Sequence, residues 1–187
     1  MTETEAILAE CKRTLAWNRA VGTGIGVFGV ITRESSVLLR RRLEKDSLYH
    51  QDLSGRWEMT GGGVDLSHFT AQLDPESYQQ AIFMCLSQEL EEEAGLKLIS
   101  LPQPLSLIPA WLWRPYEDKE TKEQRIIIDL AFSIPLKWED GHVQATKEFE
   151  EKIKKGEIMF IPIEKLGEID IISQRTRFLI EEALKVD

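Results

Sequence analysis

The feature that most constrains the fold is one long helix, predicted to run from Pro75 to Ala94. Asp74 is a favourable N-cap, proline suits the first helical position, and Gly95 is a typical C-terminal stop. Strand-like segments lie on both sides of this helix in the sequence. The helix is therefore expected to cover one face of a β-sheet.

The other elements are predicted from their hydrophobic periodicity. Strands are expected at 27–32, 37–41, 56–59, 96–101, 105–113, 125–134 and 158–163, and helices at 3–17, 144–155 and from the N-cap Ser173 to about Lys185. A charged hairpin loop is expected at 117–123. This mixed order predicts an α+β protein, an α/β/α sandwich around a mixed β-sheet. Residues 1–187 are expected to form a single domain, with 1–22 as an N-terminal helical extension.

Charge and composition exclude several classes of protein. The net charge is −9, from 32 acidic and 23 basic residues. Such an excess disfavours non-specific binding to nucleic acid or an anionic membrane, but allows a small phosphorylated substrate if metal ions neutralise the site. No apolar run approaches the roughly 20 residues that span a bilayer. Because Cys11 and Cys85 match no metal or redox spacing and no signal peptide is evident, a cytoplasmic protein is expected.

The C-terminal end of the long helix carries four glutamates. Each helical residue rotates by about 100°, so Glu92 and Glu93 fall roughly 60° and 40° on either side of Glu89. Glu91 falls on the opposite side of the helix, at about 160°. We therefore expect Glu89, Glu92 and Glu93 to share one face.

That face continues an apolar ridge formed by Tyr78, Ile82 and Cys85, which should lie against the protein. Three crowded carboxylates repel one another and lose hydration there unless a cation joins them. Hard oxygen ligands at this spacing suit Mg²⁺ or Mn²⁺ better than zinc. On helix geometry alone, a solvated acidic helix end is an equally good interpretation.

Three segments resemble the Nudix hydrolase family. Residues 89–96, Glu-Leu-Glu-Glu-Glu-Ala-Gly-Leu, match the last eight positions of the Nudix box, G-x5-E-x7-R-E-U-x-E-E-x-G-U, where U is a bulky aliphatic residue. Residues 57–65 resemble the family's tryptophan and Pro-Gly-Gly turn, with Thr60 in place of proline. Residues 172–178 look like the family's entry into its last helix. The resemblance covers about 24–183, and only the box is specific.

The resemblance implies a metal-dependent hydrolase that cleaves a pyrophosphate bond in a nucleoside diphosphate linked to another group. Glu89 and Glu93 would bind Mg²⁺ or Mn²⁺, with Glu92 as a further ligand or an orienting group. The carbonyl oxygen of Gly62 or Gly63 would complete the metal's ligands. The metal would bridge the diphosphate oxygens and polarise a water for in-line attack.

Candidate substrate contacts come from the strand ends and from the three consecutive glycines at 61–63, called here the glycine segment. They are Arg40, Arg56, Trp57, Gly61 and Gly63. An arginine among 40–42 could contact phosphate, and an aromatic residue could stack on a nucleobase. The general base is left open between Glu89 and one of Glu148, Glu150 or Glu151.

The sequence departs from the box at two positions. Gln88 stands where the family has an arginine thought to orient the glutamates, and Gln80 stands where the box has its first glutamate. Glu76 could replace that glutamate if the helix is one turn longer. An insertion at 66–73 is either a substrate lid or a tolerated surface loop.

These departures keep two further functions open. A Nudix-fold protein without catalysis could bind a nucleotide and regulate another process. Isomerase chemistry on an isoprenoid diphosphate would need a reactive cysteine, and Cys85 on the apolar ridge is expected to be too buried. A homodimer is also open, because Trp111 and Trp113 share a strand face suited to core or dimer contact.

Overall fold

The computed structural model describes residues 25–43, 53–64, 75–117, 122 and 124–186. Within them, seven strands form one mixed sheet in which β1 (Ile25–Arg33) is central. It pairs with β7 (Gln124–Lys137) in parallel and with β2 (Ser36–Arg41) and β4 (Thr60–Gly63) antiparallel. β2 also pairs with β3 (Trp57–Glu58) and β9 (Ile158–Pro162), and β7 with β6 (Ile108–Glu117). A separate pair joins β5 (Leu96–Leu98) to β8 (Val143–Ala145).

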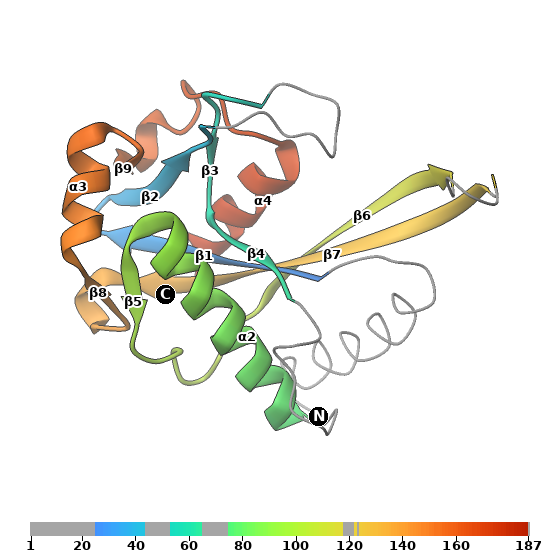
Figure 1. Ribbon diagram of the computed structural model, residues 1–187, viewed down its shortest axis with the longest axis horizontal. Coiled ribbons are helices and arrows are strands. Elements are labelled where there is room, and N and C mark those ends of the chain that lie inside the picture. The colour runs from blue at the N-terminus through green and yellow to red at the C-terminus, as the bar shows by residue number, and fades with distance from the viewer. Residues whose placement is uncertain (1–24, 44–52, 65–74, 118–121, 123, 187) are drawn as a thin grey trace.

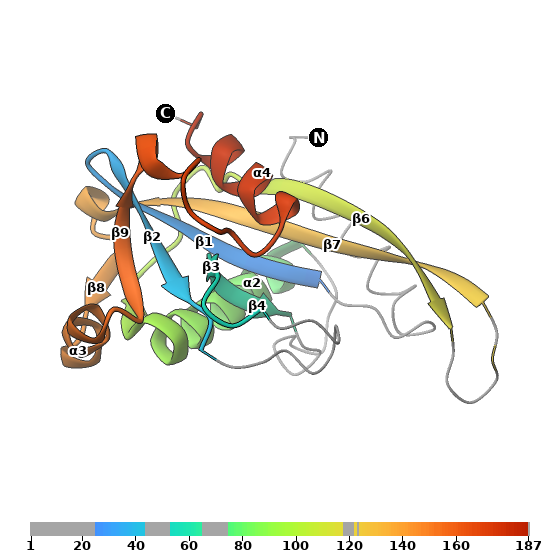
Figure 2. The ribbon, with the colours of Figure 1, turned by 90° about the horizontal axis from the view of Figure 1, so that it is seen from above.

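Helices cover both faces of the sheet (Figures 1 and 2). On one face lies α2 (Pro75–Glu89), which continues into a π-helical turn, η2 (Leu90–Ala94). On the other lies α4 (Gln174–Ala183). α3 (Lys147–Lys155) and the short helices η3 (Trp138–Asp140) and η4 (Ile163–Lys165) complete the described helices. The predicted α+β fold, a mixed sheet between helices, is confirmed.

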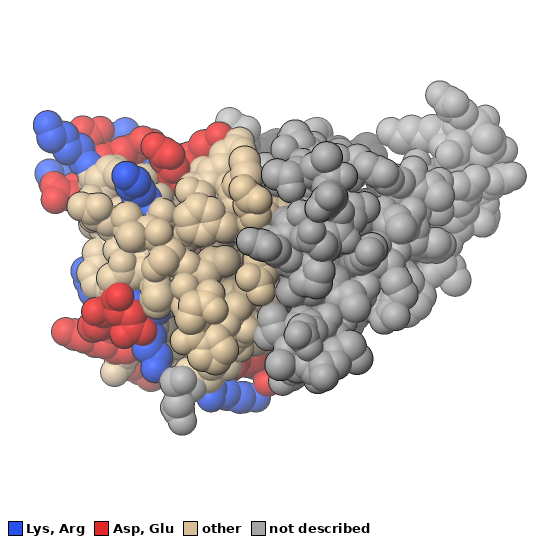
Figure 3. All heavy atoms as spheres, turned by 90° about the horizontal axis from the view of Figure 1, so that it is seen from below, with Lys and Arg blue, Asp and Glu red and all other residues tan. Residues whose placement is uncertain are grey.

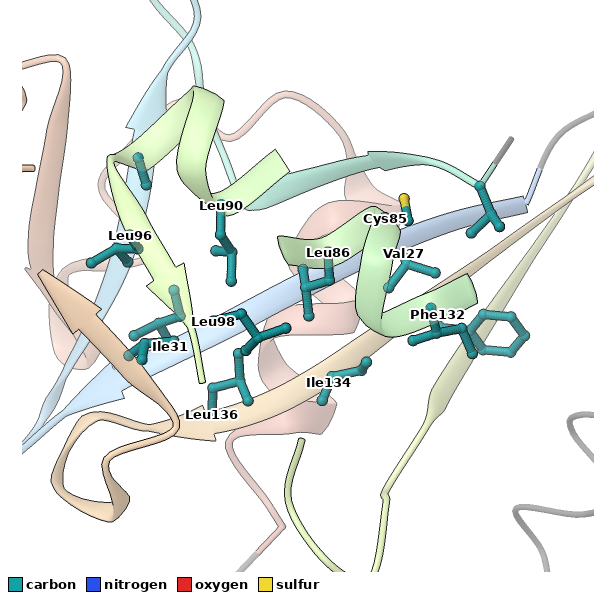
Figure 4. Packing of buried hydrophobic residues seen from close by; sticks show 14 of the residues in the cluster. Val27, Ile31, Cys85, Leu86, Leu90, Leu96, Leu98, Phe132, Ile134 and Leu136 are labelled. Atoms are coloured by element: carbon teal, nitrogen blue, oxygen red, sulfur yellow. The ribbon is translucent and has the colours of Figure 1, made fainter. Parts of the chain in front are cut away.

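Alternation along the strands divides the buried side chains into two cores. Figure 4 shows the first core, in which Leu86 and Leu90 of the long helix gather with Val27 and Ile31 of β1 and Leu136 of β7. The second core contains the strand residues that point to the opposite face of the sheet, together with the inner face of α4. Its members include Val30, Val37, Ala131, Leu179, Ile180 and Ala183. Because successive strand residues point to opposite faces, one central strand contributes to both cores.

Most predicted elements are present, and several have different bounds. The strands β6 and β7 are longer than expected and form a hairpin whose outer end extends away from the rest of the protein (Figures 1 and 2). Glu117 pairs with Gln124 at that end, which confirms the hairpin connection. The strand expected at 96–101 ends at Leu98, and the helix expected from 144 begins only at Lys147. Its N-cap, Thr146, accepts a hydrogen bond from the Glu148 backbone N–H.

The glycines at 61–63 lie in strand β4, although the resemblance likened this segment to a turn. Gly26 through Gly29 of β1 pair with Gly63 through Thr60 of β4. The absence of side chains lets β4 approach β1 and the helix together, which a glycine-rich sequence alone does not reveal. The N-terminal helix, the 66–73 insertion and the N-cap Asp74 lie outside the described residues.

No described helix is long and apolar enough to cross a membrane. Figure 3 shows one face of the molecule, with acidic and basic side chains interspersed at the end that carries α3. The described residues on that face gather no single-sign basic patch of the kind that binds nucleic acid.

Candidate active site

The site is built where β4 meets the C-terminal end of the long helix. Glu93, on η2, accepts a hydrogen bond at Oε2 from the backbone N–H of Gly61, at 3.0 Å. Gly95 follows in the left-handed conformation and ends the helix. This contact joins β4 to the C-terminal end of the helix, where the resemblance places the metal ligands.

Gly61 and Gly62 each allow a close contact that a side chain would block, with β1 and with Glu89 respectively. Gly61 has a φ of +151°, and a Cβ added there would overlap the Val27 carbonyl oxygen of β1. A Cβ added at Gly62 would overlap the carboxylate of Glu89. A Cβ added at Gly63, in contrast, would meet nothing within 4 Å. Glu89 and Glu93 are therefore both held against the backbone of β4.

An ion-pair network adjoins Glu93. Arg40 Nη2 lies 2.6 Å from Glu93 Oε1 and 2.5 Å from Glu58 Oε1. Arg42 Nη1 donates to Glu58 Oε2 at 3.1 Å. We expected Arg40 to contact substrate, and the structure pairs it with a glutamate of the box. Glu58 was not among the predicted site residues. Its position directly after Trp57, in the same predicted strand, was the available signal.

Burial and charge alter the acidity of two groups in the site. Burial raises the pKa of Glu93 to about 7; Arg40 and the Gly61 N–H oppose this, and the charges of Glu89 and Glu58 add to it. Burial, with smaller contributions from Glu89 and Glu93, raises the pKa of the Cys85 thiol to about 12. This thiol is 1% exposed and stays protonated at neutral pH, which disfavours the isomerase alternative.

Glu92 lies apart from this arrangement. It is exposed, and its Oε1 accepts a hydrogen bond from Gln88 Nε2 at 3.0 Å. No group of three His, Cys, Asp or Glu side chains that could hold a metal occurs among the described residues. The expected convergence of Glu89, Glu92 and Glu93 is therefore not met.

The π-helical turn explains the position of Glu92. The predicted positions of Glu92 and Glu93 around the helix axis used the α-helical rotation of about 100° per residue. A π-helix rotates by only roughly 80° per residue. Glu92 then falls about 120° from Glu89, and Glu93 stays within about 40°. Only Glu89 and Glu93 thus remain on the face that meets β4.

Two other predicted substrate contacts, Arg56 and Trp57, lie at the start of strand β3, and the remaining tryptophans lie elsewhere. Arg56 is paired with Asp170, with 3.2 Å between Nε and Oδ2. Trp57 is half-buried, packs against the second core and donates its backbone N–H to the Asp170 carbonyl oxygen. Trp138 packs against Phe149 and Phe160. The side chains of Trp111 and Trp113 are outside what the structure describes.

The candidate bases of α3 lie on a different side of the helix end. Glu148 forms an ion pair with Lys152 at 3.2 Å, and Lys152 Nζ also donates to the Glu92 carbonyl oxygen. Glu148 lines an open groove of about 760 Å³ together with Gln88 and Glu92. The remaining candidates, Glu150 and Glu151, are exposed. The structure therefore places Glu148 beside Glu92.

No protein-family model matches the chain, and no curated protein matches its sequence. Many of the solved structures similar to it are Nudix hydrolases. A MutT Nudix hydrolase from Burkholderia pseudomallei is 18% identical with a TM-score of 0.44, covering 85% of this chain and 96% of its own. A MutT protein from Bacillus halodurans is 12% identical with a TM-score of 0.48, covering 88% and 84%. The Ap4A hydrolase of C. elegans is 15% identical with a TM-score of 0.40, covering 87% and 96%. At TM-scores under 0.5 these likenesses carry no conclusion about activity.

Proposed function

We propose that this chain is a Nudix hydrolase that uses a divalent metal to cleave a pyrophosphate bond in a nucleoside diphosphate linked to another group. The observation that carries the proposal is the placement of two glutamates of the box-like segment, Glu89 and Glu93, against the backbone of Gly61 and Gly62. A solvated acidic helix end would leave these side chains in water. Here both are partly buried, and they are close enough for the charge of Glu89 to act on Glu93.

The donors present fit Mg²⁺ or Mn²⁺. Two carboxylates lie on one side of the helix end, and burial, which removes water from the charged form, raises the pKa of Glu93 to about 7. The carbonyl oxygens of Gly62 and Gly63 lie 3.9 and 3.5 Å from Cys85 Sγ, one helical turn before Glu89. Glu89, Glu93 and the Gly62 carbonyl would hold the ion, and Glu92 would join only after leaving Gln88.

When bound, the metal would neutralise the diphosphate and polarise a water for in-line attack on phosphorus. The protein's own residues would hold the site in shape for this. The Gly61 N–H orients Glu93, and the lack of a side chain at Gly62 leaves room for Glu89. Glu89, which lies at the site, would accept the proton of the attacking water in preference to Glu148, which lies beside Glu92. Arg40 would contribute positive charge near the phosphates.

Gln88 stands where the resemblance places an arginine that orients the glutamates. Its amide donates to a carboxylate, that of Glu92, without the charge and paired N–H groups of an arginine. Losing charge assistance roughly halves such a hydrogen bond, at about 1–2 kcal/mol, or one to two tenfold steps in rate. We therefore propose that hydrolysis persists despite this substitution.

A non-catalytic nucleotide-binding protein is the second candidate, favoured by Gln88 and by Gln80 in place of the first box glutamate. Purified protein would be tested with nucleotide sugars, dinucleotides and triphosphates in Mg²⁺ and in Mn²⁺, with Glu93→Gln as the inactive control. Turnover by the wild type and not by the variant supports the hydrolase. Tight binding of one compound without turnover under any metal would establish the binding protein instead.

A further inference from the structure

Arg40 has hydrogen-bonding capacity that the described residues do not use. One atom, Nη2, contacts the carboxylates of both Glu58 and Glu93. The Arg40–Glu58 contact lacks hydrogen-bond geometry, since Glu58 Oε1 has no hydrogen-bond partner among the described residues. Arg40 Nε is also buried without a partner among those residues. A guanidinium presents several N–H donors in a planar fork that fits phosphate, so this side chain is suited to one more acceptor.

Glu58 holds Arg40 from the neighbouring strand. The two residues are directly opposite each other in the pairing of β2 with β3. Glu58 is buried, and the hydrogen bond from Arg42 fixes its other oxygen. If Arg40 left Glu93, it would therefore still be anchored by Glu58.

A bound divalent metal ion would compete with Arg40 for the same oxygen of Glu93, Oε1. Its Oε2 is engaged by the Gly61 N–H, and its Oε1 by Arg40. A divalent ion bound at Oε1 would repel the guanidinium from the same position. Metal binding and the Arg40–Glu93 contact thus oppose each other.

We propose that Glu58 is the positioning residue of an arginine switch. When the metal binds Glu93, Arg40 breaks its contact with Glu93 and stays paired with Glu58. Its N–H groups then donate to a phosphate oxygen of the substrate. The inference rests on the proposed function, because it needs a metal at Glu93 and a phosphorylated ligand. It requires metal and phosphate to bind cooperatively, since each favours the same movement of Arg40.

The first test measures the dissociation constant of Mn²⁺ alone by isothermal titration calorimetry on the full chain. Arg40→Gln removes the competitor and should tighten Mn²⁺ binding about tenfold or more. The matched control is Arg41→Gln, which removes the same charge from the next residue of the strand, where Arg41 donates to the Gly55 carbonyl oxygen. It should change the constant less than about twofold. Equal effects of the two variants would overturn the switch.

A double-mutant cycle tests the role of Glu58. Glu58→Gln should weaken Mn²⁺ binding about tenfold in the wild type, because Glu93 is then the only carboxylate partner of Arg40 among the described residues. In the Arg40→Gln background it should change binding less than about twofold. An effect of equal size in both backgrounds would mean that Glu58 acts only through its charge, and it would overturn the proposal. If Glu58→Gln fails to fold, Glu58→Asp takes its place in the cycle with the same expected pattern.

Inorganic phosphate tests the second half of the switch. Phosphate should tighten Mn²⁺ binding by the wild type and not by Arg40→Gln; complexes of the two ions in solution affect both proteins equally. The same tightening in both proteins would overturn the phosphate role of Arg40. If wild-type protein binds no Mn²⁺, both this inference and the proposed function are wrong. If it binds Mn²⁺ and hydrolyses substrate while the cycle is additive, only the inference fails.

Discussion

Replacing Gly62 with alanine would test the contact on which the proposed site depends. An added Cβ would overlap both Oε1 and Cδ of Glu89. The backbone of Gly62 is not in the left-handed region that excludes alanine, so the conformation of the strand itself would tolerate the change. Any loss would therefore come from displacement of Glu89.

The size of the effect follows from the overlap. Glu89 Oε1 would lie 2.1 Å from the added Cβ, and an ordinary contact begins at 3.4 Å, so the carboxylate must retreat by about 1.3 Å. A misplacement of about 1 Å can cost about 100-fold in rate. The overlapping atoms are the end of a flexible side chain, which can shift with little cost in the free energy of unfolding. We expect Gly62→Ala to lower kcat about 100-fold and weaken Mn²⁺ binding, with little change in the free energy of unfolding.

Gly63→Ala is the matched control in the same strand. Its Cβ would enter open space, so the free energy of unfolding should stay unchanged or rise by up to about 1 kcal/mol. Both variants would be compared with wild type by urea denaturation and Mn²⁺ titration. If Gly62→Ala and Gly63→Ala have the same Mn²⁺ affinity, Glu89 does not depend on close approach to Gly62, and the reasoning is refuted.

Three further predictions concern the charges of the site. Glu93→Gln should nearly abolish turnover and Mn²⁺ binding in steady-state assays and titrations, because it removes a metal-binding charge; retained activity would exclude Glu93 as a ligand. Gln88→Arg should leave kcat unchanged or raise it, and a large fall would contradict an orienting role for this residue. Without metal, the free energy of unfolding should fall as pH rises. The pKa of Glu93 in the folded protein, about 7, lies above its ordinary 4.5, so its stabilising contribution is full below about 4.5 and lost as pH rises through about 7. The loss is at most about 3.5 kcal/mol, because the two pKa values differ by about 2.5 and each unit is worth about 1.4 kcal/mol. Urea denaturation across pH should show that Glu93→Gln lacks this loss.

Local signals predicted much of the fold correctly. The end of the long helix at Gly95 and the N-cap at Ser173 depend on conformations and hydrogen bonds within a few residues. Most strands follow from alternation and β-rich composition, although β5 of the separate pair ended early and β6 and β7 of the central sheet ran further. Such features are encoded within one turn or one hairpin, so the sequence alone determines them.

The site required the tertiary structure, because its contacts join distant segments. The hydrogen bond between Gly61 and Glu93 spans 32 residues, and the sequence indicated only that the two segments should meet. Nothing local showed that Arg40 would face Glu58 across two strands, or that a π-helical turn would direct Glu92 away. Strand register and helix pitch are set by packing of the whole sheet and its helix. They decided that Glu89 and Glu93 lie together against the glycines while Glu92 binds Gln88 at the surface.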